Sequence, residues 1–311
     1  MTTSQEWPRI AVVGAGAVGG YFGGRLALAG APVVMIGRES FVGAVRANGL
    51  AIETSGGVER ARVEAAADMA AVNGAEMVLF CVKSNNTELA AKALAPALGR
   101  NALVVSLQNG VDNVERIRAI TGIEVLPAAV YVAVSMPSPG QIRHLSRGDL
   151  ILGPENEITI QARQIFSRAG IGCRITSNIE GEMWLKLLCN CALNAISALG
   201  HARYGQIAAS ADARSVMQRV VNEVLAVAGA AGVTMPGASD SKSGLAAAMA
   251  IATQMEEAFS STAQDLQRGR LTEIDSLNGY ITRRGAELGI DVPVNQALFT
   301  LIKLAEGRLS R

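Results

Sequence analysis

Three polar side chains recur at helical spacing in an otherwise apolar segment of this 311-residue chain. Lys186, Asn190 and Asn194 stand at positions i, i+4 and i+8, which places them along one face of a helix. Asparagine is a poor helix former, and burying it without a partner costs free energy. The pattern indicates a polar binding face or a solvated stripe, and the lack of further charge on the stripe favours binding.

A glycine-rich segment near the N-terminus has the spacing of a dinucleotide-binding turn. An apolar run at residues 10–13 precedes the sequence GAGAVG, and a helical stretch and a second apolar run at residues 33–36 follow it. In such a unit the first glycine permits a tight turn, the second lets backbone amides approach a pyrophosphate, and the third lets helix and strand pack closely. A glycine turn without a nucleotide is the simpler alternative. The predicted cofactor contacts are Gly14, Gly16, Ala17, Val18 and Gly19.

The end of the second apolar run indicates which dinucleotide binds. An NAD site usually places Asp or Glu there to bind the ribose 2′-hydroxyl, whereas this chain reads Ile36-Gly37-Arg38. A guanidinium pairs bidentately with a 2′-phosphate, so we predict that Arg38 binds NADPH. Two alternatives remain open: Glu39 takes the acidic role if the strand ends later, or Arg38 is a solvated loop cation.

Two further apolar runs end in polar residues. The run from Met77 leads to Lys83, and the run from Leu103 leads to Asn109-Gly110. Ligands of an open α/β sheet lie beyond the carboxyl ends of its strands. We therefore expect Lys83 to bind a phosphate or a substrate carboxylate, and Asn109 to fix the ribose–nicotinamide end. Because Asn-Gly is a common turn pair, a purely structural turn remains open for Asn109.

A segment rich in Ser and Thr, residues 259–265, is followed by an acidic one. Spacing alone favours helix capping there, with Thr272 as the N-cap and Glu273 and Asp275 in the first turn of a helix.

The hydrophobic pattern divides the chain into two predicted domains. Up to residue 177, short apolar runs alternate with helical patterns, which is typical of an α/β fold with a Rossmann-type, doubly wound, mostly parallel sheet. From residue 178 to 311 long helical patterns predict an all-helical domain, starting with a helix over 178–199. We also expect residues 135–153 to form an antiparallel hairpin at the sheet edge. The expected strands are Ile10–Val13, Val33–Ile36, Met77–Val82, Leu103–Leu107, Glu124–Tyr131 and Leu150–Leu152.

Composition excludes several classes of function. A net charge of +1 and an aromatic content of 4% give no electrostatic footprint for nucleic acid or an acidic membrane. No uninterrupted apolar run approaches the ~20 residues that span a bilayer, and the first ten residues do not resemble a signal peptide, so we expect a cytoplasmic protein. Four cysteines and two histidines lack the spacing of a metal site. The Ala-rich helices fit a homodimer interface or a buried core equally well.

Five motifs in this order resemble the ketopantoate reductase (2-dehydropantoate 2-reductase) family. They are GAGAVGG, a strand ending in VK, LQNG, the helix WLKLLCNCALN and the pair SSTAQD and TEID, and the resemblance spans residues 9–307. It implies a Rossmann domain, a helical domain, and NADPH-dependent reduction of 2-dehydropantoate to (R)-pantoate for pantothenate biosynthesis.

The resemblance also implies roles for single residues. Lys186 matches the catalytic lysine that delivers a proton to the 2-oxo group, and Glu273 matches the acid that orients it. The remaining matches are Asn190 and Asn194 at the substrate's polar end, Ser261 at its carboxylate, and Lys83 and Asn109 at the junction of cofactor and substrate.

Two positions depart from the family pattern, because Tyr204 and Ala258 stand where relatives carry Asn. This leaves two alternatives to ketopantoate reduction. One is the same chemistry on a different branched 2-oxo acid. The other is a non-catalytic NADP(H)-binding redox sensor, against which the intact Lys186 and Glu273 argue.

Overall fold

The computed structural model describes residues 6–307 and divides into two compact units. Unit 1 runs up to Gln108 and resumes from Asp112 to Ile179. Unit 2 comprises Asn109–Val111 and the chain from Glu180 onward. The expectation that the first ten residues are no signal peptide falls partly on residues 1–5, which lie outside the described residues.

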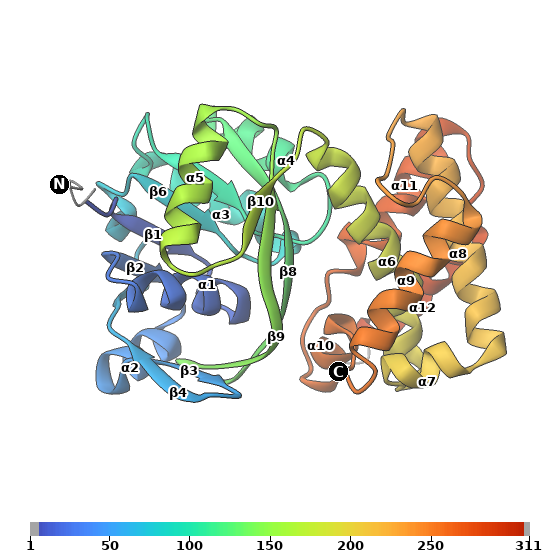
Figure 1. The fold of residues 1–311 in the computed structure, drawn as a ribbon, viewed down its shortest axis with the longest axis horizontal. Helices are drawn as coiled ribbons and strands as arrows, with labels where there is room; N and C mark the ends of the chain where they lie inside the picture. Colours follow the sequence, from blue (N-terminus) through green and yellow to red (C-terminus); the bar gives the residue numbers. More distant parts are fainter. Residues whose placement is uncertain (1–5, 308–311) are drawn as a thin grey trace. The chain divides into compact units, whose positions relative to one another are not determined.

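Unit 1 is built on a ten-stranded sheet, in the order β4-β3-β9-β8-β7-β6-β1-β2-β5 with β10 paired to β9 (Figure 1). From β1 the chain proceeds to β2 on one side and later to β6, β7 and β8 on the other, all parallel. This reversal of direction at β1 makes the sheet doubly wound, as predicted, and creates the switch point at which such sheets bind ligands. The strands are β1 (Ile10–Val13), β2 (Val33–Ile36), β3 (Leu50–Thr54), β4 (Gly57–Ala61), β5 (Glu64–Ala66), β6 (Met77–Phe80), β7 (Leu103–Ser106), β8 (Val125–Ser138), β9 (Gln141–Leu152) and β10 (Cys173–Ile175).

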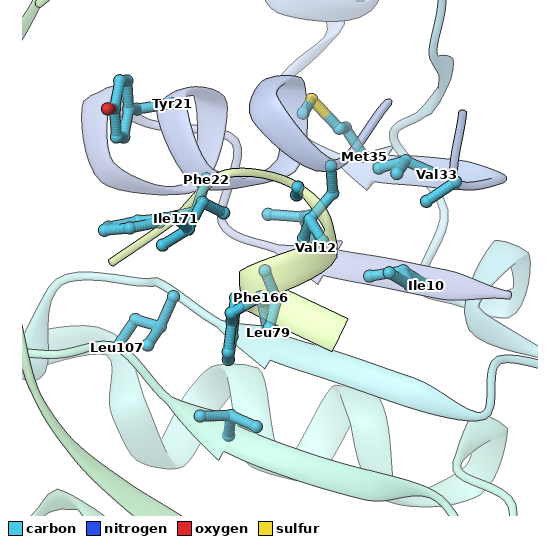
Figure 2. Close-up of a cluster of buried hydrophobic side chains, with 14 of the residues drawn as sticks. Ile10, Val12, Tyr21, Phe22, Val33, Met35, Leu79, Leu107, Phe166 and Ile171 are labelled. Carbon is cyan, nitrogen blue, oxygen red and sulfur yellow. The ribbon is translucent and has the colours of Figure 1, made fainter. Parts of the chain in front are cut away.

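Side chains alternate between two buried faces of the central parallel strands, because successive residues of a strand point to opposite sides. On one face, Val12 and Leu79 pack with Phe22 of α1 and Phe166 of α5, as Figure 2 shows. On the other face, a second cluster joins the strands to α3 and α4. Burial on both faces explains why these strands read as continuous apolar runs. The helices are α1 (Ala17–Leu28), α2 (Glu39–Asn48), α3 (Thr87–Leu94), α4 (Asn113–Thr121) and α5 (Glu157–Arg168), with short 3-10 turns η1 (Met69–Val72), η2 (Ser84–Asn86) and η3 (Ala95–Ala97).

The hairpin of unit 1 is antiparallel as expected, but its expected place at the sheet edge is wrong. It consists of β8 and β9, which pair over most of their length with three register shifts. The first part of β9 also pairs with β3 and its last part with β10, so β9 lies inside the sheet. The sequence analysis missed β3, β4, β5 and β10. Strands β5 and β10 have only three residues each, and β4 exposes all but its last residue.

Unit 2 is entirely helical within its described residues, as predicted. Helix α6 (Ile179–Gly200) follows the expected helix closely, and most of its side chains are buried in a cluster with α8 and α12. It is the one described helix long and apolar enough to cross a membrane by composition, and it forms the core of this unit. The other elements are α7 (Tyr204–Ala209), α8 (Ala211–Ala230), α9 (Ser241–Gln254), α10 (Ser261–Gln267), η4 (Ile274–Ser276), α11 (Asn278–Leu288) and α12 (Pro293–Gly307).

The helix expected to begin at Thr272 is only a 3-10 turn. The expected N-cap at Thr272 is also wrong, because the turn is preceded by Glu273 as its N-cap; Thr272 Oγ1 only accepts a hydrogen bond from the Ile274 amide, at 3.1 Å. The turn η4 stops after three residues, and α11 begins at Asn278.

Candidate functional site

The glycine turn of unit 1 folds back tightly after β1. Gly14 has a φ of +100°, a conformation that side-chain-bearing residues rarely adopt. The amides of Gly14 and Ala15 both donate to the Ile36 carbonyl, at 3.2 and 3.0 Å. The turn is thereby fixed against the end of β2, where a dinucleotide ribose is expected.

Gly16 and Gly19 differ in what surrounds them. A Cβ at Gly19 would lie 2.3 Å from the Gly14 carbonyl oxygen, so only glycine fits between helix and turn. A Cβ at Gly16 would meet nothing within 4 Å, and no side chain caps the start of α1 there. Uncapped amides beside open space, at the positive end of a helix, suit a pyrophosphate. The residues present therefore fit a dinucleotide, with Ala17 and Val18 forming the first turn of α1.

Arg38 and Lys83 follow the carboxyl ends of β2 and β6, the two strands that pair with β1. Arg38 is exposed and directly precedes α2, while β2 ends at Ile36, so the condition under which Glu39 would take the acidic role is not met. Lys83 is half-buried and directly precedes η2. The glycine turn lies against the residue before Lys83, since a Cβ at Gly14 would come within 2.6 Å of the Val82 nitrogen.

A buried glutamine that the sequence analysis did not single out connects the loops after β6 and β7. Gln108, 5% exposed, donates from Nε2 to the Val82 carbonyl at 3.0 Å and to Thr87 Oγ1 at 2.8 Å. Its Oε1 accepts a hydrogen bond from Ser106. Gln108 therefore joins the segment that carries Lys83 to the segment that carries Asn109. Its position in the LQNG motif, directly before Asn109, could have indicated this role from the sequence.

Asn109, Lys186 and Glu273 form a hydrogen-bonded chain within unit 2. Lys186 Nζ donates to Asn109 Oδ1 at 2.8 Å, and Asn109 Nδ2 donates to Glu273 Oε2 at 3.0 Å. These pairs are 77 and 164 residues apart in sequence, so only the fold brings them together. Gly110, with a φ of +93°, lies in a bend, but the Asn109 side chain has partners beyond that bend.

This arrangement places an ammonium group against a carboxamide that a carboxylate holds in one orientation. All three side chains are half-buried. An ammonium donor held in this way can polarise a carbonyl oxygen, stabilise the negative charge that develops on it, and transfer a proton to it.

The other two polar residues on the Lys186 face of α6 differ in their contacts. Asn194 is 2% exposed, and its Oδ1 accepts a hydrogen bond from the Tyr204 hydroxyl at 3.0 Å. Burial raises the pKa of Tyr204 well above its usual value, so this hydroxyl stays protonated and donates. Asn190 is half-buried and makes no side-chain hydrogen bond within residues 6–307, which leaves its amide available to a ligand.

Ser261 makes no hydrogen bond to Lys186, Asn109 or Glu273. It is exposed at the start of α10 and makes no side-chain hydrogen bond in the described part of the protein. Its neighbour Ser260 is buried, accepts a hydrogen bond from the Ala263 amide at 3.0 Å, and donates to the Asn194 carbonyl at 2.9 Å. Ser260 therefore caps α10 and ties it to α6.

The cysteines of α6 offer no alternative nucleophile. Cys189 and Cys191 are both buried, and burial raises the pKa of Cys189 to about 12. A thiol with such a pKa is almost entirely protonated at neutral pH and reacts slowly. Between residues 6 and 307, no group of three or more His, Cys, Asp or Glu side chains is placed to hold a metal ion.

Comparison with known proteins decides the family. Residues 10–157 match the family model described as ketopantoate reductase PanE/ApbA, and residues 178–306 match its C-terminal counterpart. The 2-dehydropantoate 2-reductase of Pyrococcus horikoshii is 31% identical over 304 residues, which cover 96% of this chain and 97% of that protein. The chain belongs to the ketopantoate reductase family. The family's enzyme from Halobacterium salinarum is 32% identical, covering 96% of this chain and 99% of that protein.

Solved structures of family members have the same fold. A PanE/ApbA family ketopantoate reductase from Ralstonia eutropha superposes with a TM-score of 0.91 at 45% identity, covering 97% of this chain and all of that one. A D-mandelate dehydrogenase with NADH and anilino(oxo)acetate reaches a TM-score of 0.90 at 22% identity, which shows the shared fold alone. The resemblance drawn from the five motifs and the predicted fold class are confirmed.

Proposed function

We propose that this chain is a cytoplasmic enzyme that reduces 2-dehydropantoate to (R)-pantoate with NADPH, a reaction of pantothenate biosynthesis. The observation that carries the proposal is the hydrogen-bonded chain from Lys186 through Asn109 to Glu273. Membership of a reductase family whose relatives are named 2-dehydropantoate 2-reductases supports it. A homodimer remains an expectation; a ketopantoate reductase from Staphylococcus aureus is described as dimeric.

In this proposal residues 1–177 form the NADPH-binding domain and residues 178–311 the substrate domain. The open space at Gly16 and the uncapped start of α1 suit the pyrophosphate, and the exposed Arg38 suits the 2′-phosphate. When bound, NADPH supplies the hydride. The proposed cofactor ligands are Gly14, Gly16, Ala17, Val18, Gly19, Arg38, Lys83 and Asn109.

Lys186 is the proposed proton donor. As hydride reaches carbon 2, negative charge develops on the 2-oxo oxygen, and an ammonium group beside it stabilises that charge and then transfers its proton. Asn109 holds the ammonium group in place through its carbonyl oxygen, and Glu273 fixes the amide of Asn109. Holding the donor in one geometry lowers the entropic part of the barrier.

The substrate contacts proposed from the sequence differ in their support. Asn190 is the best supported because it is half-buried on the Lys186 face and has no side-chain partner within residues 6–307. Asn194 offers its Nδ2 donors, while its oxygen already accepts a hydrogen bond from the Tyr204 hydroxyl. Ser261 retains the role given by the resemblance, as an exposed hydroxyl at the start of α10.

A specific observation favours a second candidate, the same reaction on a different branched 2-oxo acid. The two positions that depart from the family pattern are neighbours, because the Tyr204 amide donates to the Ala258 carbonyl at 3.0 Å. The Tyr204 hydroxyl also occupies the oxygen of Asn194. One of the two lone pairs of this oxygen is then taken, so Asn194 is a poorer acceptor for a substrate hydroxyl, which disfavours a hydroxylated substrate tail.

The test is NADPH oxidation by the purified protein against a panel of 2-oxo acids that includes 2-dehydropantoate. The proposal expects 2-dehydropantoate to have the highest kcat/KM. Preference for a branched acid without the hydroxyl would favour the second candidate, and NADPH binding without turnover of any acid would contradict both.

A further inference from the structure

The segment that carries Glu273 is tied to the last helix by a buried carboxylate for which the proposed reaction has no use. Glu306 of α12 is 3% exposed. Its Oε1 accepts hydrogen bonds from both the amide and the hydroxyl of Thr272, at 2.7 and 2.6 Å. Thr272 directly precedes Glu273, so α12 fixes the backbone one residue before the proposed acid.

The same carboxylate reaches the other side of Glu273 through a lysine. Lys303 Nζ lies 2.8 Å from Glu306 Oε2 and donates to Asp275 Oδ2 at 2.9 Å. Thr272 Oγ1 in turn accepts from the Ile274 amide at 3.1 Å. Glu306 thus holds the residues on both sides of Glu273, Thr272 directly and Asp275 through Lys303.

Burying a carboxylate is costly, and an apolar side chain at such a position is often as stable or more stable. Two of the four buried residues of α12, Leu298 and Ile302, are indeed apolar. A buried acid that binds one short segment directly through Oε1, and through Lys303 with Oε2, therefore needs an explanation beyond packing. Accurate placement of Glu273 supplies one, because displacing a catalytic group by about 1 Å can cost about 10²-fold in rate.

We propose that Glu306 is a positioning residue for Glu273, holding the Thr272–Asp275 segment so that the Glu273 carboxylate meets Asn109. This inference rests on the proposed function, because it assigns Glu306 a purpose in the same reaction. Glu306 acts through the backbone and through Lys303 and itself contacts no reacting atom.

The chain offers a matched control in Glu223 of α8. Its carboxylate also accepts backbone hydrogen bonds at α12, from the amides of Val294 and Asn295, each at 2.8 Å. Its hydrogen bonds within residues 6–307 go to Val294 and Asn295, and none of them reaches the Thr272–Asp275 segment. Glu223→Ala should therefore cost stability by a similar loss of buried hydrogen bonds without moving the Thr272–Asp275 segment.

The experiment compares kcat, KM and thermal stability of Glu306→Ala, Glu306→Gln and Glu223→Ala at a temperature at which all three are folded. Glu306→Ala should lower kcat about 10- to 100-fold and leave the KM for NADPH unchanged. Glu306→Gln keeps the oxygen that Thr272 needs and should recover most of the rate. Equal kcat for Glu306→Ala and Glu223→Ala, with a working wild-type enzyme, would overturn the inference.

Amide hydrogen exchange separates this inference from the proposed function, because it needs no substrate. Glu306→Ala should accelerate exchange at Thr272 and Ile274, whereas Glu223→Ala should accelerate it at Val294 and Asn295. Unchanged exchange at Thr272 and Ile274 in Glu306→Ala would overturn the anchoring. If the wild type reduces no 2-oxo acid, the proposed function fails and the positioning role fails with it, while accelerated exchange would still establish Glu306 as the anchor of the segment.

Discussion

The two candidate sites of this protein are built in opposite ways. The candidate pyrophosphate site of unit 1 consists of main-chain atoms from one short segment, Gly14–Gly19. It requires glycines, because a side chain there would fill the space that the turn or the ligand needs. The Lys186 centre of unit 2 is made of side chains from three segments that lie 77 and 164 residues apart. A backbone site is therefore damaged by adding atoms, whereas a side-chain site is damaged by removing them.

The largest expected effect is at the Lys186 centre. Lys186→Ala removes the proposed proton donor and should lower kcat by about 10²–10⁴-fold, the usual contribution of general acid catalysis. Affinity for NADPH, measured by fluorescence titration, should stay near the wild-type value, because the proposed phosphate ligands belong to unit 1. A comparable loss of NADPH affinity would show that Lys186 serves the cofactor.

In the glycine turn, single Gly→Ala substitutions should affect either the stability of the fold or the affinity for NADPH, depending on the position. Gly19→Ala forces a Cβ to within 2.3 Å of the Gly14 carbonyl and should destabilise the fold by about 1–3 kcal/mol in urea unfolding. Gly16→Ala meets no atom within 4 Å, so it should fold normally yet bind NADPH at least tenfold more weakly. Gly43→Ala, in open space within α2, is the control for both. Wild-type NADPH affinity in Gly16→Ala would contradict the approach of the pyrophosphate to this turn.

A smaller effect is expected on the preference for NADPH over NADH when Arg38 is replaced. Arg38→Ala should weaken NADPH by about 1.5–3 kcal/mol, the value of a hydrogen bond to a charged group, and change NADH little. Dissociation constants for both cofactors measure this difference. Equal weakening of NADPH and NADH would mean that Arg38 does not bind the 2′-phosphate.

The smallest expected effect is at the substrate end of α6. Tyr204→Phe frees Asn194 Oδ1 and should cost about 1 kcal/mol in the free energy of unfolding. If Asn194 binds the substrate tail, the KM for hydroxylated 2-oxo acids should fall relative to that for non-hydroxylated ones. An unchanged ratio of the two KM values would remove Asn194 from substrate selection.

The contrast between the two sites also explains what could be predicted from the sequence. The strand–turn–helix unit from Ile10 to Ile36 follows from local spacing and occurs where it was predicted. Helix α6 was predicted from its apolar length, and the shared face of Lys186 and Asn194 from its period.

Contacts made across the fold could not be predicted in this way. Nothing near Asn109 in sequence indicates that its amide joins Lys186 to Glu273, and nothing near Glu306 indicates that it holds Thr272. The place of β9 inside the sheet depends on pairing with β3, a strand about 90 residues earlier. Such pairings are set by tertiary packing, which overrides local preference.

The most direct test of the central claim, hydride transfer with protonation by Lys186, uses NADPH carrying deuterium at the transferred position. With 2-dehydropantoate, wild-type protein should yield pantoate with one deuterium at carbon 2, and Lys186→Ala should bind the cofactor but form product far more slowly. Pantoate without deuterium at carbon 2, or equal rates for the two proteins, would contradict the account.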